Sequence, residues 1–96
     1  MADVHNHIMN PDGTVGSIIV DTTWSAGWTI ARKFEVGGRD YLFLMKTGTG
    51  DVHIHSLEPN GQVGAKIADY TWSAGWTQAT FYNIGATTYM HLLKSQ

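Results

Sequence analysis

One seven-residue motif, Thr-Trp-Ser-Ala-Gly-Trp-Thr, occurs twice in the chain, at Thr23–Thr29 and at Thr71–Thr77. The two occurrences are 48 residues apart, which is half of the 96-residue chain. Asp3–Gly48 aligns with Asp51–Gln96 without a gap, and 22 of the 46 aligned positions are identical. The chain is therefore two copies of one unit, and a repeat of this length is typical of solenoids, propellers and repeat arrays.

The composition limits how so short a chain can be stabilised. Ninety-six residues suggest one small domain, here a single two-repeat unit over residues 1–96, and a chain of this size buries a smaller fraction of its surface than a large protein does. The chain has no cysteine, which excludes disulfides and cysteine metal sites. Partner chains are the remaining way to cover apolar surface.

Charge and hydropathy exclude several classes of partner. Lys and Arg total 6 and form no basic run, so no nucleic-acid partner is expected. No run of 18 apolar residues is present, so no membrane span is expected. The N-terminal residues lack the charged start and apolar core of a signal peptide. The expected location is the cytoplasm, or the outside of the cell by a route that the sequence does not show.

The pattern along each copy predicts strands rather than helices. Glycine, Thr, Val, Ile and aromatic residues are abundant, which favours an all-β protein rich in turns. Apolar and polar residues alternate in Asp51–Leu57, whereas Tyr41–Met45 is an unbroken apolar run typical of a strand buried on both faces. Turn signals occur at Asn10–Gly13 and Glu58–Gly61. The predicted strands are Asp3–Met9, Val15–Thr22, Trp28–Phe34, Tyr41–Lys46, Asp51–Leu57, Val63–Tyr70, Trp76–Tyr82 and Thr88–Lys94.

Tandem units of four short strands and 40–50 residues are the sequence form of β-propeller blades. Propellers have four to eight blades, so two four-stranded blades per chain predict a β-propeller built by oligomerisation. Head-to-tail contacts close only if the rotation per chain divides a circle. We expect a homo-trimer with six blades, with a tetramer of eight as the alternative.

The phase of the repeat predicts that one blade is divided. If Trp28–Phe34 is an innermost strand, the four strands from Trp28 to Tyr70 make one contiguous blade. The other blade has its inner pair of strands at the C-terminus and its outer pair at the N-terminus. The two halves are then expected to meet between neighbouring chains, which would bury strand edges that are otherwise open.

The repeated unit resembles tachylectin-2-like β-propeller lectins. In that family a Lys-Ile-Gly stretch is followed by Gly-Gly-Trp and an aromatic strand, and here Lys66-Ile67-Ala68 is followed by Trp72–Thr77 and Phe81-Tyr82. The family's Asp-Asn-Trp element has no counterpart in this chain. The plan of two units per chain also looks like the small bacterial and fungal fucose-binding lectins, which assemble as trimeric six-bladed rings, although their site residues do not align. The resemblance implies glycan binding at sites repeated between blades.

The Trp-Ser-Ala-Gly-Trp segments are the strongest candidates for such sites. A sugar stacks its apolar face on an indole and hydrogen-bonds to short polar groups and backbone donors. Each segment supplies two indoles, one hydroxyl and a glycine that lets a ligand approach the backbone. The candidate sugar-binding residues, including nearby charged side chains, are Trp24, Ser25, Gly27, Trp28, Trp72, Ser73, Gly75, Trp76, Asp21, Asp69 and Arg32.

Each candidate also has a structural interpretation. The tryptophans can be wedged between blades instead; we expect Trp28 and Trp76 in the core and Trp24 and Trp72 in the grooves between blades. Asp21 and Asp69 precede the tryptophan motifs, and they can either accept sugar hydroxyls or cap the linker turn. Arg32 has Thr80 as its counterpart, so it would make the two grooves unequal.

Two His-x-His pairs are the only metal-like pattern. Residues i and i+2 of a strand share a face, so His5 with His7 and His53 with His55 could each offer two ligands to Zn²⁺. Two ligands make a weak signal, and the polar face of a third strand near the blade rim is the better explanation of the pairs. No metal site and no cofactor is therefore predicted.

The sequence thus predicts a non-enzymatic, multivalent carbohydrate-binding protein. It has no Cys nucleophile, no Gly-x-Ser-x-Gly motif and no phosphate loop, so no catalytic residues are predicted. The alternative is a structural or protein-binding propeller scaffold, which includes a fragment or an engineered propeller without a specific ligand.

Overall fold

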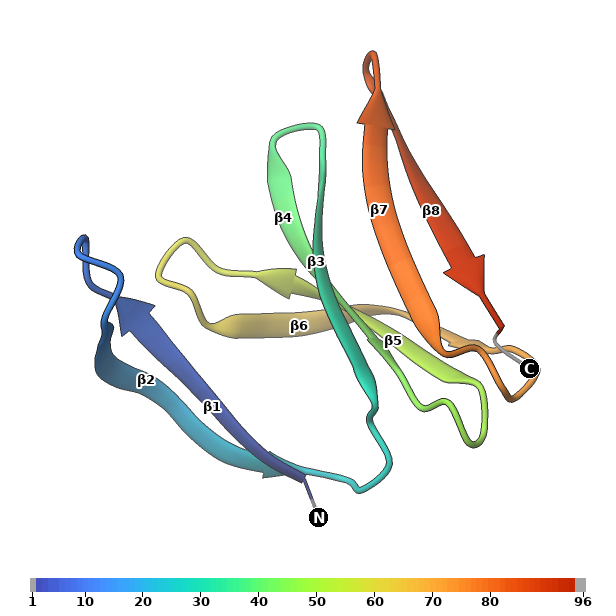
Figure 1. Ribbon diagram of the computed structural model, residues 1–96, viewed down its shortest axis with the longest axis horizontal. Coiled ribbons are helices and arrows are strands. Elements are labelled where there is room, and N and C mark those ends of the chain that lie inside the picture. Colours follow the sequence, from blue (N-terminus) through green and yellow to red (C-terminus); the bar gives the residue numbers. More distant parts are fainter. Residues whose placement is uncertain (1, 95–96) are drawn as a thin grey trace.

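The computed structural model describes residues 2–94 and shows an all-β molecule with no helix in that range (Figure 1). Accordingly, those residues include no helix that could cross a membrane. All eight predicted strands are confirmed, each within two residues of its predicted bounds. They are β1 (Ala2–Met9), β2 (Val15–Trp24), β3 (Ile30–Val36), β4 (Arg39–Met45), β5 (Asp51–Leu57), β6 (Val63–Thr71), β7 (Gln78–Ile84) and β8 (Thr87–Leu93).

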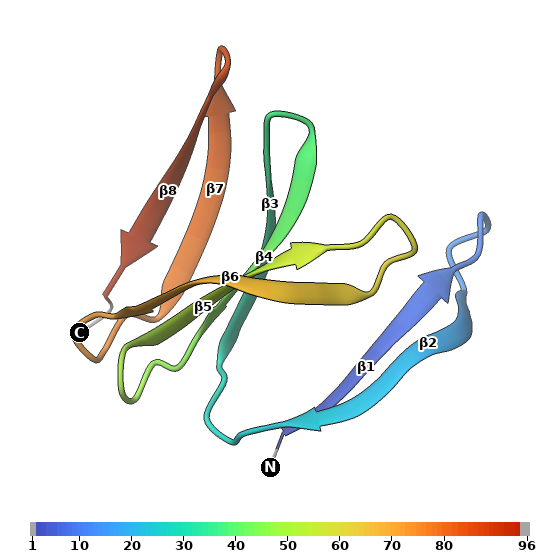
Figure 2. The same ribbon diagram turned by 180° about the vertical axis from the view of Figure 1, so that it is seen from behind.

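The strands form three antiparallel sheets. Strands β3, β4, β5 and β6 make a four-stranded sheet in that order, which confirms the predicted contiguous unit. The strands of the other unit form two separate hairpins, β1–β2 and β7–β8. These hairpins lie on opposite flanks of the four-stranded sheet, as both views show (Figures 1 and 2). The four-stranded sheet is called the central sheet below.

The core lies between the central sheet and the β7–β8 hairpin. Its buried side chains come from β3, β4, β5 and β7, and they are Ile30, Phe43, Met45, Val52 and Ala79. The rings of Phe34 and Phe81 stack across the same interface with centroids 4.5 Å apart. The unbroken apolar run of β4 is explained by this position, because Phe43 and Met45 fill the core while Leu44 lines a hollow beside the β1–β2 hairpin.

Both copies carry the same irregularity in their outer pair of strands. The register of β5 against β6 shifts on either side of His55, and that of β1 against β2 shifts on either side of His7. Bulges of this kind twist a strand and re-aim its side chains. Gly64 lies beside the shift in β6, where a β-carbon would overlap Ser56 Oγ. The His55 ring is held there, with Nδ1 3.0 Å from the Gly64 carbonyl oxygen.

Candidate functional site

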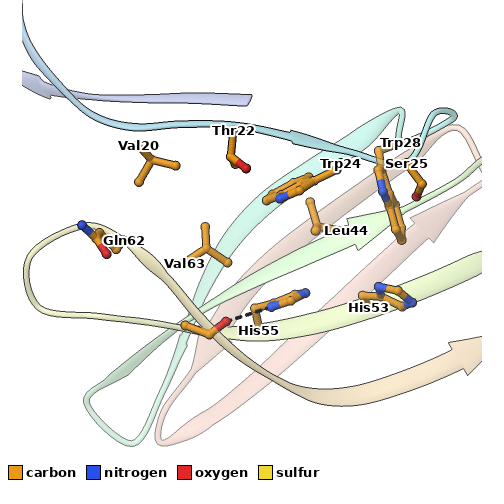
Figure 3. Close-up of a pocket in the computed structure, with 11 residues that line it drawn as sticks. Val20, Thr22, Trp24, Ser25, Trp28, Leu44, His53, His55, Gln62 and Val63 are labelled. Carbon is orange, nitrogen blue, oxygen red and sulfur yellow. Dashed lines mark hydrogen bonds between the residues drawn. The ribbon is translucent and has the colours of Figure 1, made fainter. Parts of the chain in front are cut away.

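A groove of about 410 Å³ separates β2 from the outer strands of the central sheet (Figure 3). We call it the tryptophan groove. Indole rings and aliphatic side chains supply its apolar surface, and hydroxyl, imidazole and amide groups supply its polar surface. Its lining residues are Val20, Thr22, Trp24, Ser25, Trp28, Leu44, His53, His55, Gln62, Val63 and Gly64.

The linker after β2 is shaped by its own glycine and by a lysine from β4's end. Gly27 has a φ of 102°, which L-residues with side chains rarely adopt. The Lys46 ammonium lies 4.8 Å from the centre of the Trp28 ring and donates a hydrogen bond of 3.1 Å to Ser25 Oγ. A cation over an indole face is attracted by the ring's electron density. Lys46 therefore fixes two residues of the groove at once.

The second linker is built in the same way. Gly75 has a φ of 103°, the Lys94 ammonium lies 4.6 Å from the Trp76 ring centre, and its hydrogen bond to Ser73 Oγ is 3.1 Å long. The motif and the lysine that contacts it therefore give the same linker conformation in both copies, although different sheets surround the two linkers.

The imidazoles in the groove have different partners. His53 lies against Trp28, with ring centres 4.8 Å apart, and its Nε2 is 3.6 Å from Asp69 Oδ2. Burial lowers the pKa of His53 below its ordinary value of 6.5, and the nearby Asp69 carboxylate only partly opposes this effect. The Lys66 ammonium donates a 2.9 Å hydrogen bond to Asp69 and lowers the pKa of that carboxyl. At pH 7 the His53 imidazole is therefore neutral, and the charge of the nearby Asp69 carboxylate is balanced by Lys66.

Trp24 is distinguished from the other three tryptophans by its surroundings. Trp28 contacts Lys46 and His53, whereas Trp72 lies 6.1 Å from Phe43 and 6.0 Å from Tyr70 between ring centres. Trp76 has Lys94 over its ring. Within residues 2–94, no aromatic or cationic group contacts the Trp24 ring. An indole at a groove without such a partner is free to stack on a ligand.

No protein-family model, no characterised protein and no solved structure matches the chain. The function of the groove is therefore inferred from its geometry and chemistry.

The division of the tryptophans differs from the sequence expectation. Trp24 lines the groove and Trp76 packs against the core, as expected, but Trp28 lines the groove and Trp72 packs against the core. The expectation for Trp28 was wrong, since it lies outside the core, whereas Trp72 packs against the core and also lines the hollow between the central sheet and β7–β8. The second motif is followed by β7–β8, whose Phe81 helps to enclose Trp72, whereas the first motif lies at an open flank.

The hollow beside Trp72 is consequently not a second tryptophan groove. It measures about 300 Å³, and aromatic and aliphatic side chains dominate its lining. Ser73, Gly75 and Trp76 do not line it. The two expected grooves are unequal within one chain, and only the first brings together indoles, a hydroxyl and imidazoles.

The charged candidates Asp21, Asp69 and Arg32 do not line the groove, and the two carboxylates do not cap the linkers. Asp21 Oδ1 lies 3.3 Å from His5 Nε2, as Asp69 lies near His53, so both carboxylates face the histidine of the neighbouring strand rather than capping the linker. The Arg32 guanidinium donates to the carbonyl oxygen of Ala31, and Arg32 is not among the groove residues. The alternation of β3 explains this, because Ala31 lines the hollow beside β1 and its neighbour Arg32 points to the opposite face.

Several groove residues were not predicted as sugar ligands. His53, His55 and Gln62 line the groove, and Lys46 supports it. For Lys46 the repeat gave a usable signal, because Lys46 and Lys94 are identical and occupy equivalent positions after a strand in the two copies. The histidines had been weighed only as metal ligands. Among residues 2–94, no group of three or more His, Asp or Glu side chains could hold a metal ion.

Proposed function

We propose that this chain is a non-enzymatic carbohydrate-binding protein and that the tryptophan groove holds the sugar. The supporting observation is the indole of Trp24, which has no aromatic or cationic partner among residues 2–94 and lies between the hydroxyl-bearing residues Thr22 and Ser25 (Figure 3). A pyranose presents an apolar face to an indole and hydroxyls around its rim, and this groove offers partners for both. Its volume of about 410 Å³ lies in the range of small-molecule sites.

The polar groups match a neutral ligand. Ser25, Thr22 and Gln62 carry no charge, and His53 is uncharged at pH 7 because burial lowers its pKa. Hydroxyl and amide groups can both donate to and accept from sugar hydroxyls. An anionic ligand would instead call for several cations, and Lys46 is already engaged by Trp28 and Ser25.

We further propose that the chains close into a β-propeller, with three chains and six blades. The three sheets lie side by side, and each of the two outer ones has two strands where the central sheet has four (Figure 1). Weak sugar sites repeated around one ring gain avidity when several of them engage a glycan-covered surface together. A ring with several grooves would therefore bind a glycan-covered surface tightly even if each groove alone binds its sugar weakly.

A glycan array with the Trp24→Ala variant tests the proposed function. Truncating a central aromatic residue costs at least about 2 kcal/mol of binding free energy, which corresponds to about a 30-fold loss of affinity. The control is Ile67→Ala, which removes an exposed apolar side chain of the central sheet that lines none of the hollows described. It should bind glycans as the unmodified chain does.

The native mass of Trp24→Ala is measured in parallel, so that lost binding is not confused with lost assembly. Selective loss with the mass unchanged supports the proposal. If the unmodified, folded chain binds no glycan, the groove is not a sugar site and the scaffold interpretation takes its place.

A further inference from the structure

Strands β1 and β8 each have an open edge where their counterparts in the central sheet, β5 and β4, are paired on both edges. Within residues 2–94, β1 pairs only with β2 and β8 pairs only with β7, so each has one edge without a strand partner. An open edge presents a row of backbone N–H and C=O groups that can pair with another strand. The internal repeat identifies which strand fits each edge.

The repeat supplies the pairing as a template. Strands β4 and β5 of the central sheet are the counterparts of β8 and β1, displaced by 48 residues. In the central sheet Met45 lies opposite Val52, Leu44 opposite His53, Phe43 opposite Ile54 and Leu42 opposite His55. The same register applied to the other copy would place β8 beside β1.

The two strands of one chain cannot make this pair themselves. They lie on opposite flanks of the central sheet, with that sheet between them (Figures 1 and 2). The open edges must therefore be matched between two copies of the chain.

We propose that β8 of one chain pairs antiparallel with β1 of a second chain and that this contact completes a second tryptophan groove. In the proposed register Leu93 faces Val4 of the partner subunit, and His91 faces Asn6 of the partner subunit. The pair restores a four-stranded sheet equivalent to the central one, with its outer half supplied by the partner.

Burial of equivalent residues supports this pairing. Met45 and Val52 are fully buried, whereas their counterpart Leu93 is 44% exposed and their counterpart Val4 is only partly buried. Ala79 is 1% exposed in the core, whereas Ala31, the same residue at the same position of the other copy, is exposed. Three of the five core residues thus have apolar counterparts on two uncovered halves, whereas Gln78 and His91 take the places of Ile30 and Phe43.

A vacant hollow is present where the partner strand would lie. It measures about 400 Å³ and separates β1 from β3 and β4 of the central sheet. Its apolar surface comes from aliphatic side chains and from the two indoles of the first motif: Val4, Ile30, Ala31, Leu42, Leu44, Trp24 and Trp28. By the repeat, the partner subunit's Leu93 would occupy this hollow beside Val4 and Ala31, as Met45 packs beside Val52 and Ala79 in the core.

The same contact would assemble the second groove. The linker of the second copy is already formed, with Lys94 bound to Ser73 and placed over Trp76. The imidazole that would face Trp76, as His53 faces Trp28, is His5 of the partner subunit. His5 is already set beside Asp21, and His7 Nδ1 lies 3.5 Å from the carbonyl oxygen of Gly16, as in the first groove. Each chain therefore carries one whole groove and two complementary halves.

The identity of the ligand in the second groove rests on the proposed function, but the pairing does not. The tests of pairing accordingly use no sugar. If the chains pair but bind no glycan, the proposed sugar site fails and the pairing stands; if glycans bind to a single chain, the sugar site stands and the pairing and the ring closure fail.

Engineered disulfides test the register, and the absence of cysteine from the chain gives a clean background. The variant His91→Cys/Asn6→Cys places cysteines on residues that the register sets opposite each other, within the Cα separation that disulfides require. The control His91→Cys/Ile8→Cys moves one cysteine by two residues along the same strand, beyond easy reach. Under mild oxidation the first variant should form covalent oligomers of the native size and the control should not. Equal cross-linking of both, or cross-linking of neither, would overturn the register.

A charge substitution tests the contact independently of cysteine chemistry. Leu93→Lys puts a charge on a side chain that is 44% exposed in the isolated chain but buried in the proposed pair, so the chain should stay folded by circular dichroism and sediment as a monomer. Val36 is also 44% exposed, at the β3–β4 tip, and Val36→Lys should keep the mass of the unmodified protein. An unchanged mass for Leu93→Lys would contradict the pairing.

Discussion

Identical residues in the two copies occupy different surroundings, and this contrast explains most of the site. Trp24 and Trp72 follow the same strand and begin the same linker, yet Trp72 is enclosed by Phe43 and Tyr70 while Trp24 lines two hollows. The sequence specifies the linker conformation through Gly27 and Gly75, whereas burial depends on which sheet lies next to it.

Protonation of His53 should destabilise the protein. Its pKa is lowered in the folded state chiefly by burial, and Lys66 and His55 add to the lowering while Asp69 and Asp51 oppose it. The unfolded chain therefore binds a proton at this residue more readily than the folded chain does. The free energy of unfolding should fall as the pH is lowered through 6.5 towards the folded-state pKa, and stay level in this respect above 6.5.

Urea unfolding at a series of pH values, in the unmodified chain and in His53→Gln, measures this contribution. The variant should show a smaller loss of stability between pH 7 and pH 5. Equal slopes for both proteins in that interval would show that His53 makes no such contribution.

At the scale of elements, the positions of the strands could be predicted from the sequence, whereas the surroundings of the side chains between the sheets could not. The alternation in Asp51–Leu57 and the turn signal at Glu58–Gly61 are local patterns. They can be recognised in the sequence without knowing which other segments pack nearby. The phase of the repeat places β1–β2 before the central sheet and β7–β8 after it, and the structure shows them as two separate hairpins. The roles of Trp28 and Trp72 were not predictable, because enclosure depends on contacts that the sequence pattern does not encode.

The turn between β4 and β5 anchors the second linker and can be tested directly. Gly50 accepts a 2.8 Å hydrogen bond from the Trp72 N–H and has a φ of 82°, and a β-carbon there would overlap the Trp72 carbonyl. Gly50→Ala should lower the free energy of unfolding by more than about 1 kcal/mol. Gly48 lies in the same turn with open space around it, so Gly48→Ala should leave stability unchanged or raise it slightly.

Chemical unfolding of both glycine variants supplies the comparison. The explanation would be wrong if the two substitutions destabilised the protein to a similar extent, because the effect would then reflect the general loss of glycine in the turn.

At the scale of the whole molecule, exposed apolar surface is concentrated on the two flanks. Large apolar side chains that are exposed on the hairpins are Ile8, Met9, Val15, Ile18, Tyr82, Ile84, Tyr89, Met90 and Leu93. The corresponding set on the central sheet is Val36, Ile67 and Tyr70. Exposed apolar side chains gathered on two elements in this way are typical of interaction sites, and the repeat makes another copy of the chain the partner we expect.

Native mass spectrometry at low micromolar concentration tests the closed ring most directly. We expect one dominant species with three times the 10.6 kDa mass of the single chain, stable on dilution because both open edges of every chain are paired. Four chains would mean eight blades and leave the edge pairing intact. A single folded chain at all concentrations would contradict the account, since both flanks would then remain in water.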